Sequence, residues 1–296
     1  MTAGTPDWLQ NGRGALPSQS WSFAADARLA DVHLARESGD VLLTDDSGGM
    51  YLLDRRGRVQ ALTRTSHVVK PVVIADDGSS GAAILDAATL AWFDRKLQFR
   101  WTKSLPDEAV GLDMSAHGTH VIVSLASGLN VVYDADKQKM LDFEAMRPLR
   151  FVQLLTKTPA IVAAADYGFF ARYSLDGQPE WTERLWSTVA DIAVTGDGNT
   201  IALAALAHGI QIYDGEGTSK GSFVLDGTAH LISSTYAKKR WATATLEKQL
   251  LMLDSDGDLK WMVTAPDDVA RLELSPFGDW LLVGFAGGRV VRLDCA

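Results

Sequence analysis

The sequence has a single cysteine, Cys295, and no apolar run long enough to form a membrane-spanning helix. One thiol cannot form a disulfide within the chain, which favours a reducing compartment. The residues up to Pro17 lack the basic start and apolar stretch of a secretory signal. We therefore expect a cytoplasmic protein that does not engage a membrane.

Basic residues are also scarce. The chain has 28 Lys and Arg against 37 Asp and Glu, giving a formal net charge of -9. Proteins that grip nucleic acid do so with clustered Lys and Arg against phosphate, and an acidic balance disfavours that mode of binding. The expected partner is therefore not a nucleic acid.

Local catalytic and cofactor motifs are missing too. The sequence contains no phosphate-binding glycine loop, no helical metal motif and no Gly-x-Ser-x-Gly nucleophile turn. His117 and His120 flank a glycine but lack the usual ligand spacing, and paired aspartates such as Asp76 and Asp77 lack the spaced oxygens of a calcium loop. We predict no catalytic residue, no metal and no cofactor, which favours a non-enzymatic role.

What the chain does have is a repeat of 40 residues. An aspartate recurs at this spacing, with the small polar Ser174 in the one gap: Asp54, Asp94, Asp134, Asp214, Asp254 and Asp294. An apolar column precedes it by 22 residues: Val32, Val72, Leu112, Val152, Ile192, Ile232 and Leu272. A fixed period of this length is typical of repeat architectures, and it defines seven units.

Within each unit the pattern has period two and is bounded by glycine turns, which indicates strands. The last unit predicts strands over 272–274, 280–283 and 289–293. A fourth strand is marked by Trp101, Trp181 and Trp261, each seven residues after the aspartate column. Each unit is therefore expected to form a four-stranded antiparallel sheet.

The seventh unit ends at Ala296, before a fourth strand is possible. Continuing the count around a ring leads back to Trp21, so the segment over 18–25 is expected to supply the missing outer strand. Such closure removes a free sheet edge. The predicted fold is an all-β, seven-bladed β-propeller over residues 17–296, preceded by a tail over residues 1–16.

Two blade segments resemble known propeller families. The segment over 269–294, with Leu274-Ser275-Pro276-Phe277-Gly278 and a closing Leu293-Asp294, resembles a WD-repeat unit. The segment over 253–261, which ends in Trp261, resembles a quinoprotein-type blade. The resemblance implies the propeller fold, but it implies no one activity because these folds carry many unrelated functions.

One column of the repeat is basic in alternate blades: Lys70, Arg150 and His230. Its position just before the innermost strand places it at one mouth of the central channel, where the three side chains could converge on an anion or an acidic side chain. The alternative is that they bond carbonyls or carboxylates between blades. A neighbouring polar column is expected to face channel water: His33, Asp113, Gln153, Ser233 and Glu273.

The same face is expected to carry loops with residue types that dominate protein interfaces: His67, Arg147, Tyr167, Trp186, His208 and Phe285. The alternative is that each aromatic side chain packs over the blade below it. These loops favour a scaffold that binds a protein partner through one ring face. The other candidate is a small-ligand binder or enzyme of the quinoprotein or lactonase-like class with its site at the channel mouth.

Overall fold

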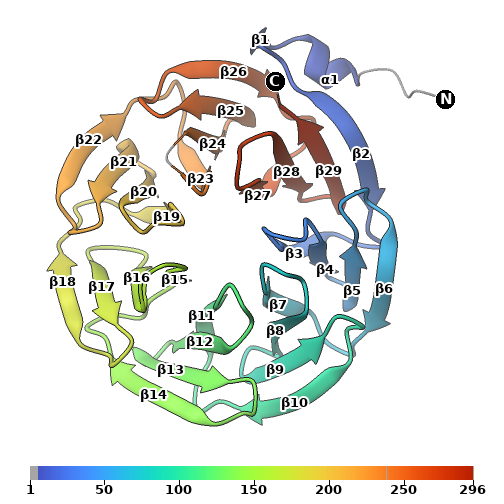
Figure 1. Cartoon of the computed structure of the whole chain (residues 1–296). Helices are drawn as coiled ribbons and strands as arrows, with labels where there is room; N and C mark the ends of the chain where they lie inside the picture. The colour runs from blue at the N-terminus through green and yellow to red at the C-terminus, as the bar shows by residue number, and fades with distance from the viewer. Residues whose placement is uncertain (1–5, 238, 296) are drawn as a thin grey trace.

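The computed structural model describes residues 6–237 and 239–295, which form a ring of seven antiparallel sheets around a central channel (Figure 1). Each sheet is a blade whose first strand lines the channel and whose last strand forms the rim. The seven-bladed propeller and its four-stranded blades are therefore confirmed.

The first four blades follow chain order from the channel outward. Blade 1 contains β3 (Leu29–Leu34), β4 (Val41–Asp45), β5 (Gly49–Leu53) and β6 (Val59–Arg64). Blade 2 contains β7 (Val69–Ile74), β8 (Ser80–Leu85), β9 (Thr89–Asp94) and β10 (Phe99–Ser104). Blade 3 contains β11 (Ala109–Met114), β12 (His120–Leu125), β13 (Leu129–Asp134) and β14 (Lys139–Glu144). Blade 4 contains β15 (Phe151–Leu154), β16 (Ala160–Ala164), β17 (Phe170–Ser174) and β18 (Pro179–Glu183).

The remaining blades include both ends of the described chain. Blade 5 contains β19 (Val189–Val194), β20 (Thr200–Ala205), β21 (Gly209–Asp214) and β22 (Ser219–Phe223). Blade 6 contains β23 (Ala229–Ser234), β24 (Arg240–Thr245), β25 (Gln249–Asp254) and β26 (Leu259–Thr264). Blade 7 contains β27 (Val269–Leu274), β28 (Trp280–Phe285), β29 (Arg289–Asp294) and, as its outer strand, β2 (Ser18–Ala24).

The ring closes through the N-terminal strand, as expected. β2 pairs antiparallel with β29, and Trp21 lies opposite Arg292. This pairing joins the two ends of the repeat within one sheet and leaves no unpaired outer edge on β29 (Figure 1).

The segment before β2 packs against blade 6. The short helix α1 (Asp7–Gln10) is followed by β1 (Arg13–Gly14), which adds a fifth strand beside β26. Gly14 has φ of +83°, and a Cβ atom there would lie 2.0 Å from the Lys260 carbonyl oxygen, so only glycine fits this approach. Leu9 is fully buried in the core between blades 6 and 7. Of the predicted tail, residues 1–5 lie outside the described part of the chain.

The cores lie between neighbouring blades. The second and third strands of a blade are buried on both faces, whereas the outer strands alternate between exposed and half-buried residues. Between blades 4 and 5, for example, Phe170 packs against Tyr213 with ring centroids 5.2 Å apart. Burial of apolar surface between sheets thus holds the ring together.

The repeated aspartate shapes the third turn of the blade, between its third and fourth strands. Asp54 Oδ1 accepts hydrogen bonds from the backbone N–H groups of Arg56 (2.9 Å) and Arg58 (3.0 Å). The same pair of bonds, to the second and fourth residues after the aspartate, recurs at Asp94, Asp134, Asp214 and Asp254. The column is therefore explained by turn geometry.

Three of the four repeated tryptophans join one blade to the next through a hydrogen bond. The indole N–H of Trp21 donates to the Arg55 carbonyl (3.1 Å), and Trp101 and Trp181 donate to Ala135 (2.8 Å) and Gly215 (2.9 Å). Each bond spans 34 residues and reaches the third turn of the following blade. These tryptophans are structural, as their spacing predicted.

Candidate functional site

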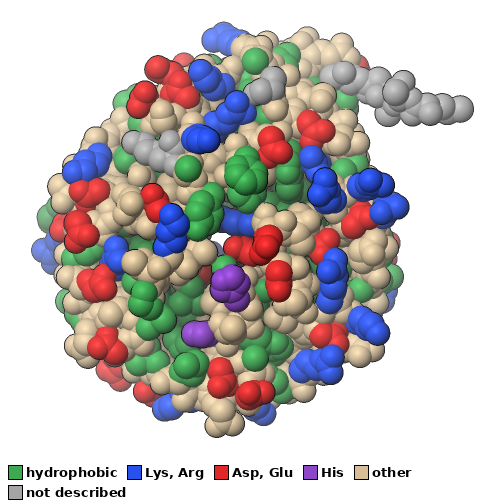
Figure 2. Space-filling view, in the orientation of Figure 1, with side chains coloured by type: hydrophobic (Ala, Val, Ile, Leu, Met, Phe, Trp, Pro, Cys, Tyr) green, Lys and Arg blue, Asp and Glu red, His purple; other side chains and the backbone are tan. Residues whose placement is uncertain are grey.

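The central channel holds a cavity of about 520 Å³ that runs along the inner strands. Lys70 and Arg150 line it near one mouth, where the inner strands begin, and Arg36 and Asp76 line it near the other. Figure 2 shows acidic side chains beside the central opening on the face turned to the viewer. The channel is thus open and polar, as a water-filled or ligand-binding channel requires.

The three basic residues predicted at the channel mouth do not form one cluster. Arg150 is largely exposed, and its Nε lies 3.4 Å from a carboxylate oxygen of Asp166. His230 does not line the cavity, and its Nε2 lies 2.9 Å from the Val269 carbonyl oxygen of the next blade. Arg150 and His230 therefore bond a carboxylate and a carbonyl, which leaves Lys70 as the member facing the cavity without such a partner in the described chain.

Polar residues of the inner strands instead bond one blade to the next. Asp31 Oδ2 accepts from the Val72 N–H (3.0 Å), and Asp191 Oδ2 accepts from the Ile232 N–H (2.9 Å). Two positions further along the strand, the same relation links His33 to Ile74, Asp113 to Leu154 and Ser233 to Leu274. All five bonds span 41 residues.

These bonds provide acceptors for backbone N–H groups at the free edge of an inner strand. The inner strand of each blade has an edge with no neighbouring strand, and its N–H groups need acceptors. In blades 2, 4, 6 and 7 a side chain from the preceding blade provides one, so these inner-strand polar residues have a structural role first.

An ion pair and three further carboxyl groups share this channel. The Arg271 guanidinium pairs with Asp31, whose charge raises the Arg271 pKa. Burial raises the pKa of Asp113 and of Glu273 to about 7 and that of Asp191 to about 6. Near pH 7 Asp113 and Glu273 are therefore each partly protonated, and the channel carries less negative charge than its composition suggests.

The channel contacts do not form a metal centre. No group of three or more His, Cys, Asp or Glu side chains in the described residues is arranged to hold a metal ion. Cys295 is half-buried, and burial raises its thiol pKa to about 12, so it is not a reactive nucleophile.

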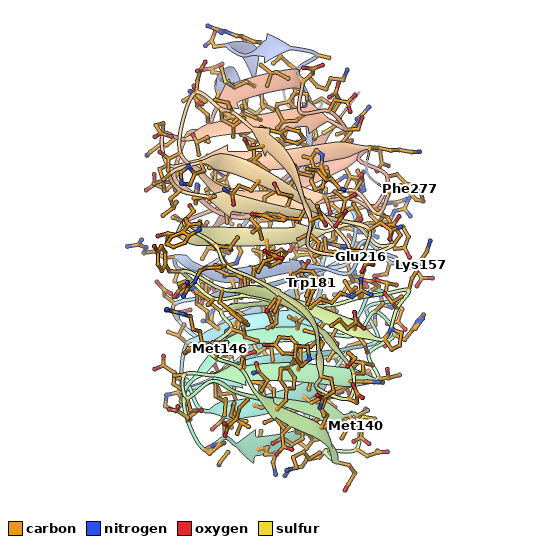
Figure 3. The ribbon with its side chains drawn as sticks, turned by 90° about the vertical axis from the view of Figure 1, so that its left-hand side faces the viewer. Met140, Met146, Lys157, Trp181, Glu216 and Phe277 are labelled. Atoms are coloured by element: carbon orange, nitrogen blue, oxygen red, sulfur yellow. The ribbon has the colours of Figure 1, made fainter. Side chains whose placement is uncertain are left out.

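A second candidate site lies on the face opposite Phe277 and Lys157. We call it the connection face: it comprises the second turn of each blade and the segments that connect an outer strand to the next inner strand. Figure 3 shows the ring from the side, with Met146 on this face and Phe277 and Lys157 on the other. Five of the six predicted interface residues are exposed on it: His67, Arg147, Tyr167, Trp186 and His208.

Phe285, the sixth, is fully buried. The Trp8 ring packs edge-on against it at 5.9 Å, and the Arg289 guanidinium lies 5.1 Å from its ring centroid. The N-terminal segment thus covers this position, so Phe285 follows the alternative in which the aromatic ring packs over its own blade.

Three of the exposed predicted residues, Arg147, Tyr167 and Trp186, lie close together at blade 4. A Cβ atom on Gly168 would lie 3.8 Å from the Arg147 guanidinium, which places Arg147 beside the turn that holds Tyr167. Tyr167 pairs through an isolated β-bridge with Thr188, two residues after Trp186. The turn therefore lies beside two connections: a backbone bridge joins it to one, and the Arg147 side chain of the other lies next to it.

Two residues that the sequence did not single out complete this cluster. Met146 is 86% exposed next to Arg147, and the Arg184 guanidinium lies 5.7 Å from the Trp186 ring centroid. We call Met146, Arg147, Tyr167, Arg184 and Trp186 the Trp186 patch. Met146 and Arg184 belong to no repeated column of the sequence. Their exposure in the folded structure was therefore the only signal that could identify them.

Exposed large hydrophobic residues are distributed very unevenly over the ring. Seven lie on the connection face: Val68, Met146, Tyr167, Trp186, Leu206, Val224 and Leu246. Six of these, all but Val68, belong to the arc of blades 4 to 6. The opposite face carries Phe277 at a first turn, and five further exposed hydrophobic residues lie on the outer strands at the rim: Val59, Leu62, Phe99, Met140 and Leu259. A concentration of apolar residues on one side is a feature of interaction surfaces.

No protein-family model matches the chain, and a search of the curated proteins finds no matching relative. In the described part of the chain, no helix has both the length and the apolar character needed to cross a membrane.

Proposed function

We propose that this propeller is a non-enzymatic interaction scaffold that binds a protein partner through the Trp186 patch on its connection face. The observation that carries the proposal is Trp186 itself, which is 76% exposed on a rigid blade, with Met146 and the 48% exposed Tyr167 on neighbouring loops. Trp, Tyr, Arg and Met are enriched in protein interfaces, and Trp, Tyr and Arg supply most of their hot spots.

The rigidity of the patch supports the same function. The Val189 N–H donates to the Asp166 carbonyl (2.9 Å), and Leu185 is buried between Arg184 and Trp186. Anchored loops need little ordering when a partner binds, so less binding free energy is lost to conformational entropy. The proposal extends to a WD-repeat or quinoprotein-like ancestry and to a cytoplasmic setting, the latter supported by the single cysteine.

Site-specific photocrosslinking tests the proposal. A benzophenone amino acid is placed at Trp186 or Tyr167, with Phe277 as the control position on the opposite face. In cells that produce the protein, both patch positions should crosslink to the same partner and the Phe277 position should not. With that partner purified, Trp186→Ala should weaken binding by roughly tenfold or more, whereas Phe277→Ala should leave it unchanged. Equal crosslinking from both faces, or none from the patch, would overturn the proposal.

A small-ligand function of the channel is the second candidate, favoured by the cavity of about 520 Å³. It ranks second because many of the polar groups in the channel already bond neighbouring blades. Native mass spectrometry of the purified protein distinguishes the two functions. A stoichiometric bound metabolite, lost on Lys70→Ala substitution, would favour the channel; the ligand-free mass favours the scaffold.

A further inference from the structure

The Trp186 patch contains two arginines whose charges are not paired within the described chain. Arg147 and Arg184 are both exposed, and within the described residues neither forms an ion pair or a side-chain hydrogen bond. Asp166, on the turn that also holds Tyr167, pairs with a different arginine: one of its carboxylate oxygens lies 3.4 Å from Arg150 Nε. The patch therefore presents two uncompensated guanidinium groups on a protein whose formal net charge is -9.

We infer that the partner segment recognised by the Trp186 patch is an acidic peptide, with Asp or Glu side chains next to aromatic or aliphatic ones. This inference rests on the proposed function. A guanidinium pairs with a carboxylate through two parallel hydrogen bonds, and this geometry favours carboxylates over other acceptors. Met146, Tyr167 and Trp186 provide exposed apolar surface in the same patch as the two charges.

The stacking of Arg184 on Trp186 strengthens this reading. With its Cζ 5.7 Å from the ring centroid, the guanidinium is positioned by the indole and keeps its N–H groups available to a ligand. A positioned arginine loses less side-chain entropy on binding than a freely rotating one. The two parts of the patch thus act together on a ligand that is both acidic and apolar.

The surrounding surface favours a peptide over a nucleic acid. Exposed acidic residues lie on the same face in the connections between other blades, among them Glu108, Asp226 and Asp268. A nucleic-acid backbone would extend from the two arginines into this negative surface, whereas a short acidic segment need not. A single-stranded oligonucleotide therefore serves as a competing outcome in the test.

Fluorescence anisotropy with defined peptides tests the inference on the intact protein. Three labelled 12-residue peptides are compared: one alternating Glu with Phe and Leu, one with Lys in place of Glu, and one with Ser in place of Phe and Leu. The acidic apolar peptide should bind at least about tenfold more tightly than either control. Its affinity should fall when ionic strength rises from about 0.05 to about 0.5 M, since salt screens exposed charges.

Charge reversal on the protein supplies the matched comparison. The double variant Arg147→Glu, Arg184→Glu should lose at least about tenfold in affinity for the acidic peptide and gain affinity for the Lys peptide. Arg28→Glu is the control, because Arg28 is exposed on the same face but distant from blade 4. It should change neither affinity. The milder Arg147→Gln, Arg184→Gln pair is used if the reversal affects folding in a thermal melt.

Three results would overturn the inference: no binding of the acidic peptide, equal binding of acidic and basic peptides, or tighter binding of a labelled oligouridylate. Failure of the proposed function is a different result, because there the photocrosslinks from Trp186 and Tyr167 capture no partner. A captured partner whose contact segment lacks acidic residues would overturn the inference and leave the proposed function standing.

Discussion

In the channel, Arg271 is paired with Asp31, and the carboxylates of Asp31 and Asp191 each accept backbone N–H groups of the next blade. In the Trp186 patch, Arg147 and Arg184 have no carboxylate partner within the described chain. Similar side chains thus hold the ring together in one region and remain available in the other. Charged side chains that are paired within the protein should therefore govern its stability, whereas exposed charged side chains without a partner should govern binding.

The largest expected effect is on the channel side. Asp31→Ala should lower the free energy of unfolding by about 3–5 kcal/mol, because it leaves Arg271 unpaired and two backbone N–H groups without an acceptor. Asp191→Ala is the matched control: Asp191 makes the equivalent two backbone bonds but no ion pair, so its loss should be smaller. Urea unfolding measures both. Equal losses would mean that the ion pair adds nothing.

Two tryptophans five residues apart extend this comparison between side chains that pack within the fold and side chains that are exposed. Trp181 packs on Phe170 at 4.8 Å and donates to the Gly215 carbonyl, so Trp181→Ala should cost about 3 kcal/mol of stability. Trp186→Ala removes an exposed ring and should change stability by less than about 0.5 kcal/mol. Equilibrium denaturation of the two variants checks this, and a large loss at Trp186 would make its role structural.

The N-terminal segment offers an intermediate effect. Gly14→Val places a side chain against the Lys260 carbonyl at positive φ, so β1 should detach from β26 at a cost of roughly 1–3 kcal/mol. Hydrogen exchange should then rise over residues 6–16 and at Phe285. Gly221→Ala is a control for backbone strain alone, because its φ is +116° but no atom lies within 4 Å of a Cβ there. Unchanged exchange after Gly14→Val would show that the segment tolerates the clash.

The last comparison concerns a pH dependence in the channel. The folded-state pKa of Asp113 is about 7, above its ordinary value of 3.8, because the group is buried. The folded protein therefore binds a proton that the unfolded chain has lost, and this contribution to stability is complete below pH 4 and disappears as pH rises through 7. Asp113→Asn should remove that slope, since an amide does not titrate but can still accept from the Leu154 N–H.

Unfolding at pH 4.5, 6 and 7.5 measures this difference. Near Asp113, the Arg36 charge lowers its pKa and the Asp76 charge raises it, and both remain in the variant. The pH dependence of stability that comes from His33 has the opposite sign. Burial lowers the pKa of His33 to about 4, so its contribution to stability is lost as pH falls below 6.5. Because His33 is present in both proteins, it should cancel in the comparison. Parallel stability curves would contradict the prediction.

The fold was predictable because its determinants repeat. Turn aspartates such as Asp54, blade-joining tryptophans such as Trp101 and the closing Trp21 each recur at fixed spacing for a local reason: a turn cap, a carbonyl acceptor or a strand pairing. The polar channel column was also placed on the right surface. Its bonds to the following blade, such as Asp113 to Leu154, were not predicted.

The candidate site was only partly predictable because it does not repeat. The spacing placed Arg147, Tyr167 and Trp186 on one face but equally placed Phe285 there, which the N-terminal segment buries. His230 was expected to converge with Lys70 and instead bonds the Val269 carbonyl.

The sequence by itself determined the seven blades, the four strands in each and the closure of the ring, because period-two patterning and glycine turns act locally and recur every 40 residues. Tertiary structure alone decided which exposed residues meet. Tyr167 and Trp186 are neighbours only because a turn pairs with the connection to the next blade, and Phe285 is covered only because a distant segment packs over it. Such contacts depend on the three-dimensional path of the chain, which the spacing within a repeat does not encode.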